Sequence, residues 1–339
     1  MINMKKELPF TIAPICTFPS INAPLGIALS YDAPKAWFYN KFVQIYGTRY
    51  HLYSHYGCFI DGDSSPAACP FITRNVLTRR YVNNSFDTFS DFIIHHINCG
   101  YYVYAFLDRY YNEKSENFMV KHFPHQLLIF GYDTEKEIFL GADFFNGIYK
   151  TEEISFNGIE EGYQNYDKRQ AINLGEYPDV ITYTYKPCNW DFDFKILISS
   201  LEDYLNCIAS TKVFYYWFPQ DVQKHFRYGL DYYCILRSLI KDKILDVRAF
   251  HILYEHKKMM RLRFSYLKET FQLDFPEVAA YEEMEYMSQV IRNLIIKHNL
   301  SEQKNIFQKL IVQLDKIESC EREILPELVN KLIRTAYSS

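Results

Sequence analysis

Glycine is scarce in this sequence, with 12 glycines among 339 residues. None of them forms a GxGxxG or GxxxxGK[ST] run, the patterns in which backbone amides approach a phosphate group closely. An excess of charge is also lacking, because 37 lysines and arginines face 41 aspartates and glutamates and the net charge is -4. A protein without a basic field has little to attract a nucleic acid. We therefore expect neither a nucleotide-binding loop nor a nucleic-acid partner.

Paired cysteines and long apolar runs are missing as well. The eight cysteines are scattered without a CxxC pair, so we expect mostly buried thiols rather than disulfides or zinc ligands. The histidines have no companion set at ligand spacing, and we expect no metal ion and no organic cofactor. No stretch approaches the roughly eighteen uncharged apolar residues of a membrane span, and the first residues lack a signal-peptide pattern. These absences predict a cytoplasmic protein with no membrane partner.

Aromatic residues, in contrast, are abundant: the chain has 30 tyrosines and 27 phenylalanines, and 48% of all residues are hydrophobic. A chain of this length and composition can form one large folded domain or two ordinary ones. Helical and strand patterns are mixed up to Pro187, whereas helical patterns dominate from about Asp191. We therefore predict the α+β class, with an α+β domain at residues 1–190 and a helical domain at residues 191–339.

In the first domain, residues 25–31 are apolar and helix-compatible, with Pro24 tolerated only in the first helical turn. An aromatic and β-branched run is expected to end as a strand near Asp108. The next two strand patterns are separated by a short turn, and they predict a β-hairpin. The remaining expected elements are a helix at residues 86–98, hairpin strands at residues 125–133 and 137–144, and strands at residues 147–155 and 179–185.

The helical domain carries five amphipathic patterns, and we expect the last of them to be broken near Pro326. Its strongest basic run is HKKMMRLR at residues 256–263. Such a run is most often a solvated helix face, and the alternative is a docking patch for an acidic partner. The aromatic clusters at residues 215–218 and 228–233 are expected to be mainly core, with some side chains lining an acyl pocket.

Two residues of the expected hairpin have the chemistry of an acyl-transfer site. Such a site needs a nucleophile at a helix start, a histidine within hydrogen-bond reach, and a third group that orients the histidine. His125 opens the first hairpin strand and Asp143 lies near the end of the second, so the hairpin places the two side by side. Taken singly, His125 also fits an ordinary half-buried strand histidine, and Asp143 fits a turn-forming residue.

The run HQLLIFGYDTEKEIFLGADFF at residues 125–145 resembles a segment of papain-like proteins of the C39 peptidase type. It is still more similar to the butirosin-H-type acyltransferases of natural-product pathways. The likeness covers residues 10–150, including the preceding GYYVYAFLDRYY. It implies a papain-like cysteine-protease fold, with His125 as general base and Asp143 as the orienting acid. It also implies amide formation in thiotemplated secondary metabolism, such as nonribosomal peptide biosynthesis.

The nucleophile is where this sequence departs from the resemblance. In those families, the catalytic cysteine is followed by an apolar residue after five positions, an apolar residue after nine and an aromatic residue after eleven. Leu25, Leu29 and Tyr31 fit this spacing if the nucleophile position is Ser20 rather than Cys16. Ser20 is then either a natural serine nucleophile or a replacement for a cysteine. The other possibilities are Cys16 as nucleophile, or a Cys16 thiol and an N-terminal Ser20 cap that do not react.

A second departure concerns the oxyanion donor. Papain-like peptidases carry a glutamine about six residues before the nucleophile, and Pro14 occupies that position here. The absence of this glutamine argues more strongly against a peptidase than against an acyltransferase. Backbone amides at the helix start can still donate hydrogen bonds to an oxyanion.

The combined prediction is an amide-forming acyltransferase. It takes an acyl group from a carrier-protein thioester to a small amine through an acyl-enzyme intermediate at Ser20 or Cys16, with His125 and Asp143 completing the triad. An acyl or peptidyl carrier protein is the expected partner, and its phosphopantetheine arm is part of the substrate rather than a cofactor. The alternatives are a papain-like peptidase or thioesterase, and a non-catalytic scaffold that binds carrier-linked chains.

Overall fold

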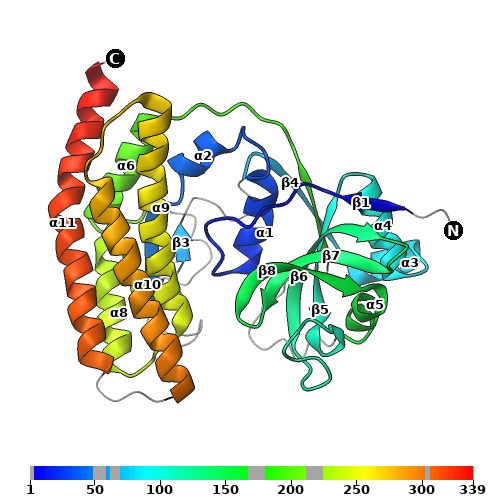
Figure 1. Ribbon diagram of the computed structural model, residues 1–339. Coiled ribbons are helices and arrows are strands. Elements are labelled where there is room, and N and C mark those ends of the chain that lie inside the picture. Colours follow the sequence, from blue (N-terminus) through cyan, green and yellow to red (C-terminus); the bar gives the residue numbers. More distant parts are fainter. Residues whose placement is uncertain are drawn as a thin grey trace. The chain divides into compact units, whose positions relative to one another are not determined.

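The computed structural model describes residues 4–48, 59–61, 69–166, 180–210, 224–301 and 306–338 (Figure 1). The chain divides into two compact units. Unit 1 consists of Met1–Pro34 and Ser65–Asn189, and unit 2 consists of Lys35–Ser64 and Trp190–Ser339. The division after Asn189 falls where the composition changes. Residues 35–64, which were expected in the first domain, belong instead to unit 2.

Unit 1 is built on an antiparallel sheet with the strand order β4-β9-β5-β6-β7-β8, and β1 pairs with β6. The expected hairpin is confirmed: Leu128 of β6 faces Ala142 of β7 across the pair, and Asp133 faces Ile138 beside the turn. The strands of this sheet are β1 (Lys5–Glu7), β4 (Ile72–Leu77), β5 (Tyr102–Asp108), β6 (Pro124–Asp133), β7 (Ile138–Phe145), β8 (Ile148–Ser155) and β9 (Val180–Tyr185). Strands β5 to β9 lie close to their predicted ranges, whereas β1 and β4 were not predicted.

Helices cover this sheet on both faces, with α1 on one side and α3, α4 and α5 on the other (Figure 1). Their ranges are α1 (Pro19–Ala28), α3 (Arg79–Ser85), α4 (Phe89–Asn98) and α5 (Phe156–Gln164), and the single turn η3 (Arg109–Tyr111) follows β5. Thr88 and Ser155 cap α4 and α5 by accepting from backbone N–H groups of the first turn. Unit 1 is therefore an α+β layer structure, in agreement with the predicted class.

Helix α1 starts earlier than its apolar run predicts. It begins at Pro19, and Pro24 is its sixth residue, so the expectation that Pro24 lies in the first turn is wrong. Proline lacks the N–H that would bond the carbonyl of Ser20. Tertiary contacts compensate for this loss, because the fully buried Asn22 donates through Nδ2 to the carbonyl oxygens of Ala13 and Ile15. These bonds fasten the segment that contains Cys16 against the helix.

Unit 2 combines a helical bundle with a small antiparallel sheet of order β10-β2-β3. Pairing of Phe226 in β10 with Thr48 in β2 joins residues that are far apart in the sequence, and it explains why residues 35–64 belong here. The elements are α2 (Lys35–Asn40), β2 (Gln44–Thr48), β3 (Phe59–Asp61), α6 (Phe194–Leu205), β10 (Phe226–Tyr228), η6 (Gly229–Asp231), α8 (Tyr232–Lys241), α9 (Val247–Phe271), α10 (Val278–Ser301) and α11 (Ile306–Ser338).

The last helix is continuous, which corrects the expected break near Pro326. Helix α11 passes through Pro326 without ending. Leu325, Leu328 and Leu332 around it are completely buried, and their burial offsets the hydrogen bond that proline removes. No helix among the described segments is long and apolar enough to cross a membrane.

The basic run of α9 is neither a solvated face nor a docking patch, because His256, Lys257 and Arg263 are completely buried. Lys257 forms an ion pair with Glu321 of α11. Arg263 donates to the carbonyl oxygens of Tyr39, Lys41 and Phe42 at 2.8, 2.6 and 3.0 Å. Burial lowers the pKa of Arg263 to about 10. These cations hold the bundle to the segment that carries β2.

The expectation of mostly buried thiols is wrong for the seven described cysteines, none of which forms a disulfide. Only Cys69 is buried; Cys99 and Cys234 are exposed, and the other four are intermediate. Of the aromatic clusters, Tyr232 and Tyr233 are core residues as expected. Residues 215–218 and Cys58 lie outside the described residues.

Candidate active site

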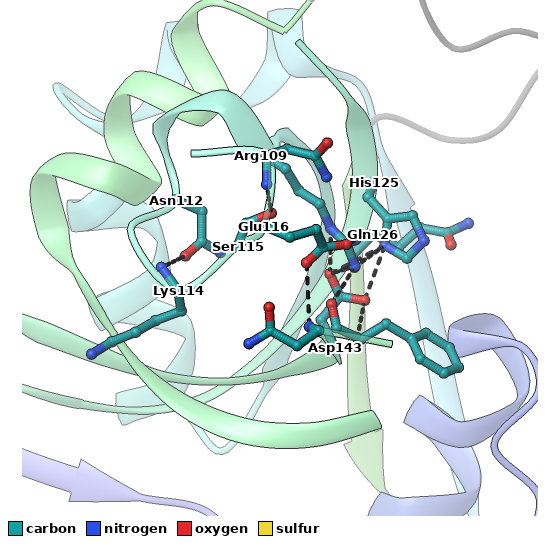
Figure 2. A network of polar contacts seen from close by, with 11 residues as sticks. Arg109, Asn112, Lys114, Ser115, Glu116, His125, Gln126 and Asp143 are labelled. Carbon is teal, nitrogen blue, oxygen red and sulfur yellow. Dashed lines mark hydrogen bonds and ion pairs between the residues drawn. The ribbon is translucent and has the colours of Figure 1, made fainter. Parts of the chain in front are cut away.

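His125 and Asp143 are in direct contact, as the predicted hairpin requires. His125 is the second residue of β6 and Asp143 lies near the end of β7. The Nδ1 atom of His125 lies 2.9 Å from Oδ1 and 3.1 Å from Oδ2 of Asp143 (Figure 2). The carboxylate is buried with 2% of its side chain exposed, whereas 22% of the histidine side chain is exposed. A histidine bonded through Nδ1 to a buried carboxylate presents Nε2 for proton transfer.

Arg109 holds the same carboxylate from the other side. Its Nη2 lies 2.6 Å from Oδ2 of Asp143 and its Nε lies 3.2 Å away, and Nη2 also donates to the carbonyl oxygen of Phe144 at 2.7 Å. The backbone N–H of Phe144 donates to Oδ1 at 2.6 Å. These fixed donors set the orientation of Asp143 before any ligand is present, which is the kind of support a catalytic carboxylate needs.

The guanidinium of Arg109 also touches the histidine, with Nη2 at 3.0 Å from Nδ1 of His125 (Figure 2). An N–H of arginine is always a donor. Two protonation patterns therefore compete: Nδ1–H donating to Asp143, or a bare Nδ1 accepting from Arg109. Only the first leaves Nε2 of His125 free to accept a proton. Arg109 thus influences which tautomer the ring adopts.

Asp108 anchors the chain just before this arginine. It is buried, and its Oδ1 accepts from the backbone N–H groups of Tyr110 and Phe123 at 3.0 and 2.9 Å. Its Oδ2 lies 2.6 Å from Nδ1 of His122. The carboxylate of Asp108 therefore closes the loop between β5 and β6. Asp108 pairs with Pro124, the residue before His125, so the two ends of this loop lie side by side.

A small cavity adjoins the pair. It is lined by residues of β5, η3, β6, β7 and α5, and its volume of about 10 Å³ is room for roughly one water molecule. The lining residues are Leu107, Asp108, Arg109, Asn112, His125, Leu127, Asp143, Gly158 and Ile159. This cavity is too small for an acyl chain, and solvent reaches His125 instead at its exposed edge.

The candidate nucleophiles lie in the layer on the opposite face of the sheet. Ser20 is the second residue of α1, and Cys16 precedes the helix by three residues; both are half-buried. Tyr102 belongs to the same layer, because its hydroxyl donates to the carbonyl oxygen of Pro9. Side chains alternate between faces along a strand, so Tyr102 and the cavity residue Leu107 of β5 point to opposite faces.

Tyr149 connects the two layers at one end of the sheet. Burial raises the pKa of its hydroxyl well above the usual value, and the neighbouring charges of Asp143 and of a Cys16 thiolate add to the rise. Tyr149 is the second residue of β8, and it pairs with Phe144 of β7. Cys16 and Asp143 are thus both close enough to Tyr149 to affect the pKa of its hydroxyl. The hydroxyl of Tyr149 is buried without a hydrogen-bond partner among the described residues.

The start of α1 offers limited oxyanion donors. Pro14 cannot donate from its backbone, and neither can Pro19, the first helical residue. The N–H groups of Ile21 and Asn22 already bond the carbonyl oxygen of Phe18. Ser20 keeps an N–H that has no acceptor inside the helix, as is general for a first turn, and it is the backbone donor best placed to meet a developing oxyanion.

Arg109 and Tyr149 were not expected from the sequence. Arg109 follows directly after the strand-ending Asp108, and a charge adjoining an apolar strand is a signal that could have indicated a buried ion pair. Tyr149 carries no such signal, since it is one of 30 tyrosines. Its position becomes apparent only from the pairing of β7 with β8.

A scan against protein-family models finds no match, and a search of curated proteins finds no similar sequence.

Proposed function

We propose that unit 1 is a papain-like acyl-transfer module that forms an amide from a carrier-protein thioester and a small amine. His125 is the general base, Asp143 orients it, and the nucleophile comes from the start of α1. Because α1 packs on the opposite face of the sheet, its first residues have to reach His125 around the end of the strands. The helix register assigns the nucleophile to Ser20, and Cys16, three residues before the helix, is the second candidate. The single observation that carries the proposal is the hydrogen-bonded His125–Asp143 pair at the ends of adjacent strands.

The proposed reaction has two steps. The nucleophile attacks the thioester carbonyl while His125 accepts its proton, and the carbon–sulfur bond to the carrier breaks as the carrier thiol leaves with that proton. The amine then attacks the acyl-enzyme and gives a proton to His125. The amide forms, the enzyme–acyl bond breaks, and His125 returns the proton to the nucleophile.

Three features of the site support this chemistry. The carboxylate is buried and fixed by Arg109 and Phe144, the imidazole keeps an exposed edge, and the segment between Cys16 and Ser20 adjoins a helix start. A helix N-terminus favours a thiolate or alkoxide and a developing oxyanion.

Intact-mass spectrometry of the whole chain with an acyl carrier thioester tests the proposal. The wild type is expected to gain the mass of one acyl group and to lose it on addition of a competent amine, with release of the amide. Ser20→Ala and Cys16→Ala are matched variants, and only one of them should abolish the adduct. Ser20→Cys should retain it if position 20 is the nucleophile.

The rival functions give different results in the same experiment. A peptidase or thioesterase releases free acid at a rate that no amine changes. A scaffold binds the carrier without any covalent adduct in the wild type or in Ser20→Cys. Either result overturns the acyltransferase proposal.

A further inference from the structure

An apolar loop (residues 118–123) projects into solvent beside His125. Four of its six side chains are large, hydrophobic and exposed: Phe118 is 40% exposed, Met119 67%, Val120 77% and Phe123 39%. Single exposed apolar residues are ordinary, whereas a contiguous apolar group marks a binding surface more often.

Hydrogen bonds hold this loop in place. The N–H groups of Met119 and Val120 donate to the carbonyl oxygens of Tyr110 and Asn117, both at 3.0 Å. At its end, the N–H of Phe123 donates to Oδ1 of Asp108 at 2.9 Å. Met119 has a φ of 54°, a left-handed conformation that disfavours methionine. The fold therefore maintains the exposure of these side chains at a conformational cost.

The loop is continuous with the proposed active site. The ring of Phe123 lies nearly parallel to that of His125, with centroids 5.8 Å apart and 18° between the planes. The guanidinium carbon of Arg109 lies 5.8 Å from the centroid of Phe123. Just before the loop, Glu116 accepts from Nη1 of Arg109 at 3.4 Å and from the N–H of Asn146 at 3.3 Å (Figure 2). A ligand against Phe123 is thus within reach of the imidazole.

The charges of the loop do not favour an ionic ligand. Lys121 is its one lysine, and His122 is paired with Asp108. In the preceding stretch, the positive charge of Lys114 lies between the negative charges of Glu113 and Glu116 in the sequence. With no concentration of one sign, the recognition that remains is burial of apolar surface.

We propose that the apolar loop binds the acyl chain of the substrate and makes the site selective for apolar acyl groups. This inference rests on the proposed acyl transfer at His125. The acyl chain lies along Val120, Met119 and Phe123, which places its carbonyl carbon near the imidazole. The aliphatic chain excludes water from this side of His125, which favours attack by the amine over hydrolysis.

The kinetic test uses N-acetylcysteamine thioesters from acetyl to octanoyl with one fixed amine. A fully buried methylene group is worth about fourfold in binding, and we expect kcat/KM to rise about twofold per methylene for a partly covered chain. The double variant Met119→Asn/Val120→Ser should lower the preference for octanoyl over acetyl, measured as the ratio of their kcat/KM values, by about tenfold or more. Asparagine tolerates the φ of Met119, so folding should be preserved.

Val76→Ser is the matched control, since Val76 is 52% exposed on β4 at the other edge of the sheet. It should leave the chain-length preference intact. An equal loss in Val76→Ser, or an unchanged preference in the double variant, overturns the loop proposal while the acyltransferase activity of the wild type stands.

A binding test separates the loop from the chemistry. Octanamide cannot transfer its acyl chain, and its binding is followed by shifts of the amide resonance of Lys121, a loop residue that the double variant leaves unchanged. Shifts in the wild type that vanish in the double variant support the loop even if no thioester is turned over, and their absence overturns it. The loop could instead bind a second copy of this chain, and sedimentation velocity tests this. Self-association that the double variant abolishes would overturn the acyl-chain proposal.

Discussion

Each unit buries a carboxylate against a cation, and the two clusters differ in what completes them. In unit 1, Asp143 is shared by Arg109 and by His125, whose ring is partly exposed. In unit 2, Glu321 and Lys257 are both completely buried. Three phenols close that cluster: Tyr204, Tyr233 and Tyr281 donate to Glu321 at 3.0, 2.8 and 3.4 Å.

This contrast separates a polar cluster that a ligand can reach from one that is closed to solvent. The partly exposed imidazole of His125 can meet a ligand at the end of its strand. The buried network joins α6, α8, α9, α10 and α11 and specifies how the bundle packs. Burial raises the pKa values of these three tyrosines well above their usual value, and the charge of Glu321 adds to the rise. They therefore remain hydrogen-bond donors to Glu321 at neutral pH.

Breaking the sealed pair should have the largest effect on stability. Lys257→Met leaves Glu321 buried without its cation, and we expect a loss of about 3–5 kcal/mol in the free energy of unfolding. Chemical denaturation measures this. The double variant Lys257→Met/Glu321→Leu should recover much of the loss, because it removes the uncompensated charge. Equal stability of the single and double variants would show that the ion pair is not the source of the effect.

Removing the partly exposed His125 should have a large effect on the rate of acyl transfer and a small one on stability. His125→Ala should lower the rate of acyl transfer by about a thousandfold, within the range of lost general-base catalysis. Its effect on unfolding should stay below about 1 kcal/mol, since the ring is partly exposed and lies at a strand end. The rate comes from the mass-spectrometric assay and the stability from denaturation. If the variant keeps its rate of acyl transfer but loses several kcal/mol in the free energy of unfolding, His125 has a structural role instead.

The buried histidine of unit 2 predicts a pH dependence of stability. Burial lowers the pKa of His256 well below 6.5, and the adjacent Lys257 adds to the fall. Its Nε2 lies 2.8 Å from the carbonyl oxygen of Val43, its Nδ1 lies 3.1 Å from Nζ of Lys257, and Tyr204 stacks on the ring. The unfolded chain takes up a proton near pH 6.5 and the folded chain does so only at lower pH.

His256 therefore contributes stability above about pH 6.5 that is lost on acidification, with a slope of up to about 1.4 kcal/mol per pH unit. Unfolding curves from neutral to mildly acidic pH measure the slope. His256→Gln should flatten it, whereas an unchanged slope in that variant would assign the dependence to other groups.

The smallest expected effect tests the unpartnered phenol of unit 1. Tyr149→Phe removes a buried hydroxyl without a hydrogen-bond partner among the described residues, so the free energy of unfolding should rise by about 1 kcal/mol. Tyr132→Phe is the matched control, because the Tyr132 hydroxyl donates to Oδ1 of Asn98 at 2.7 Å, and it should lose a similar amount. Destabilisation by Tyr149→Phe would mean that its hydroxyl has a partner.

Local patterns predicted much of unit 1 correctly. The turn between residues 133 and 137 fixed the register of the hairpin, and the register brought His125 to Asp143. Long-range packing decided the rest. The pairing of β2 with β10 has no local signal, and the carbonyl acceptors of Arg263 lie more than two hundred residues earlier in the chain. The basic run was therefore expected to be solvated, although two of its four cations, Lys257 and Arg263, are completely buried.

The two prolines inside helices misled the prediction of the helix limits for the same reason. Pro24 and Pro326 each remove one hydrogen bond, and apolar burial on both sides outweighs that loss. Sequence reasoning weighs the local loss and cannot weigh the burial until the neighbouring elements are known.

The assignment of Lys35–Ser64 to unit 2 has a practical consequence for anyone dissecting the gene. A fragment that stops near residue 190 keeps β2 but discards β10, and it leaves an open strand edge that invites aggregation. It also discards Arg263, the donor to three carbonyl groups beside that strand. Expression of either half as a contiguous piece should give insoluble protein, whereas removal of residues 35–64 from unit 1 is the cut that follows the division into units.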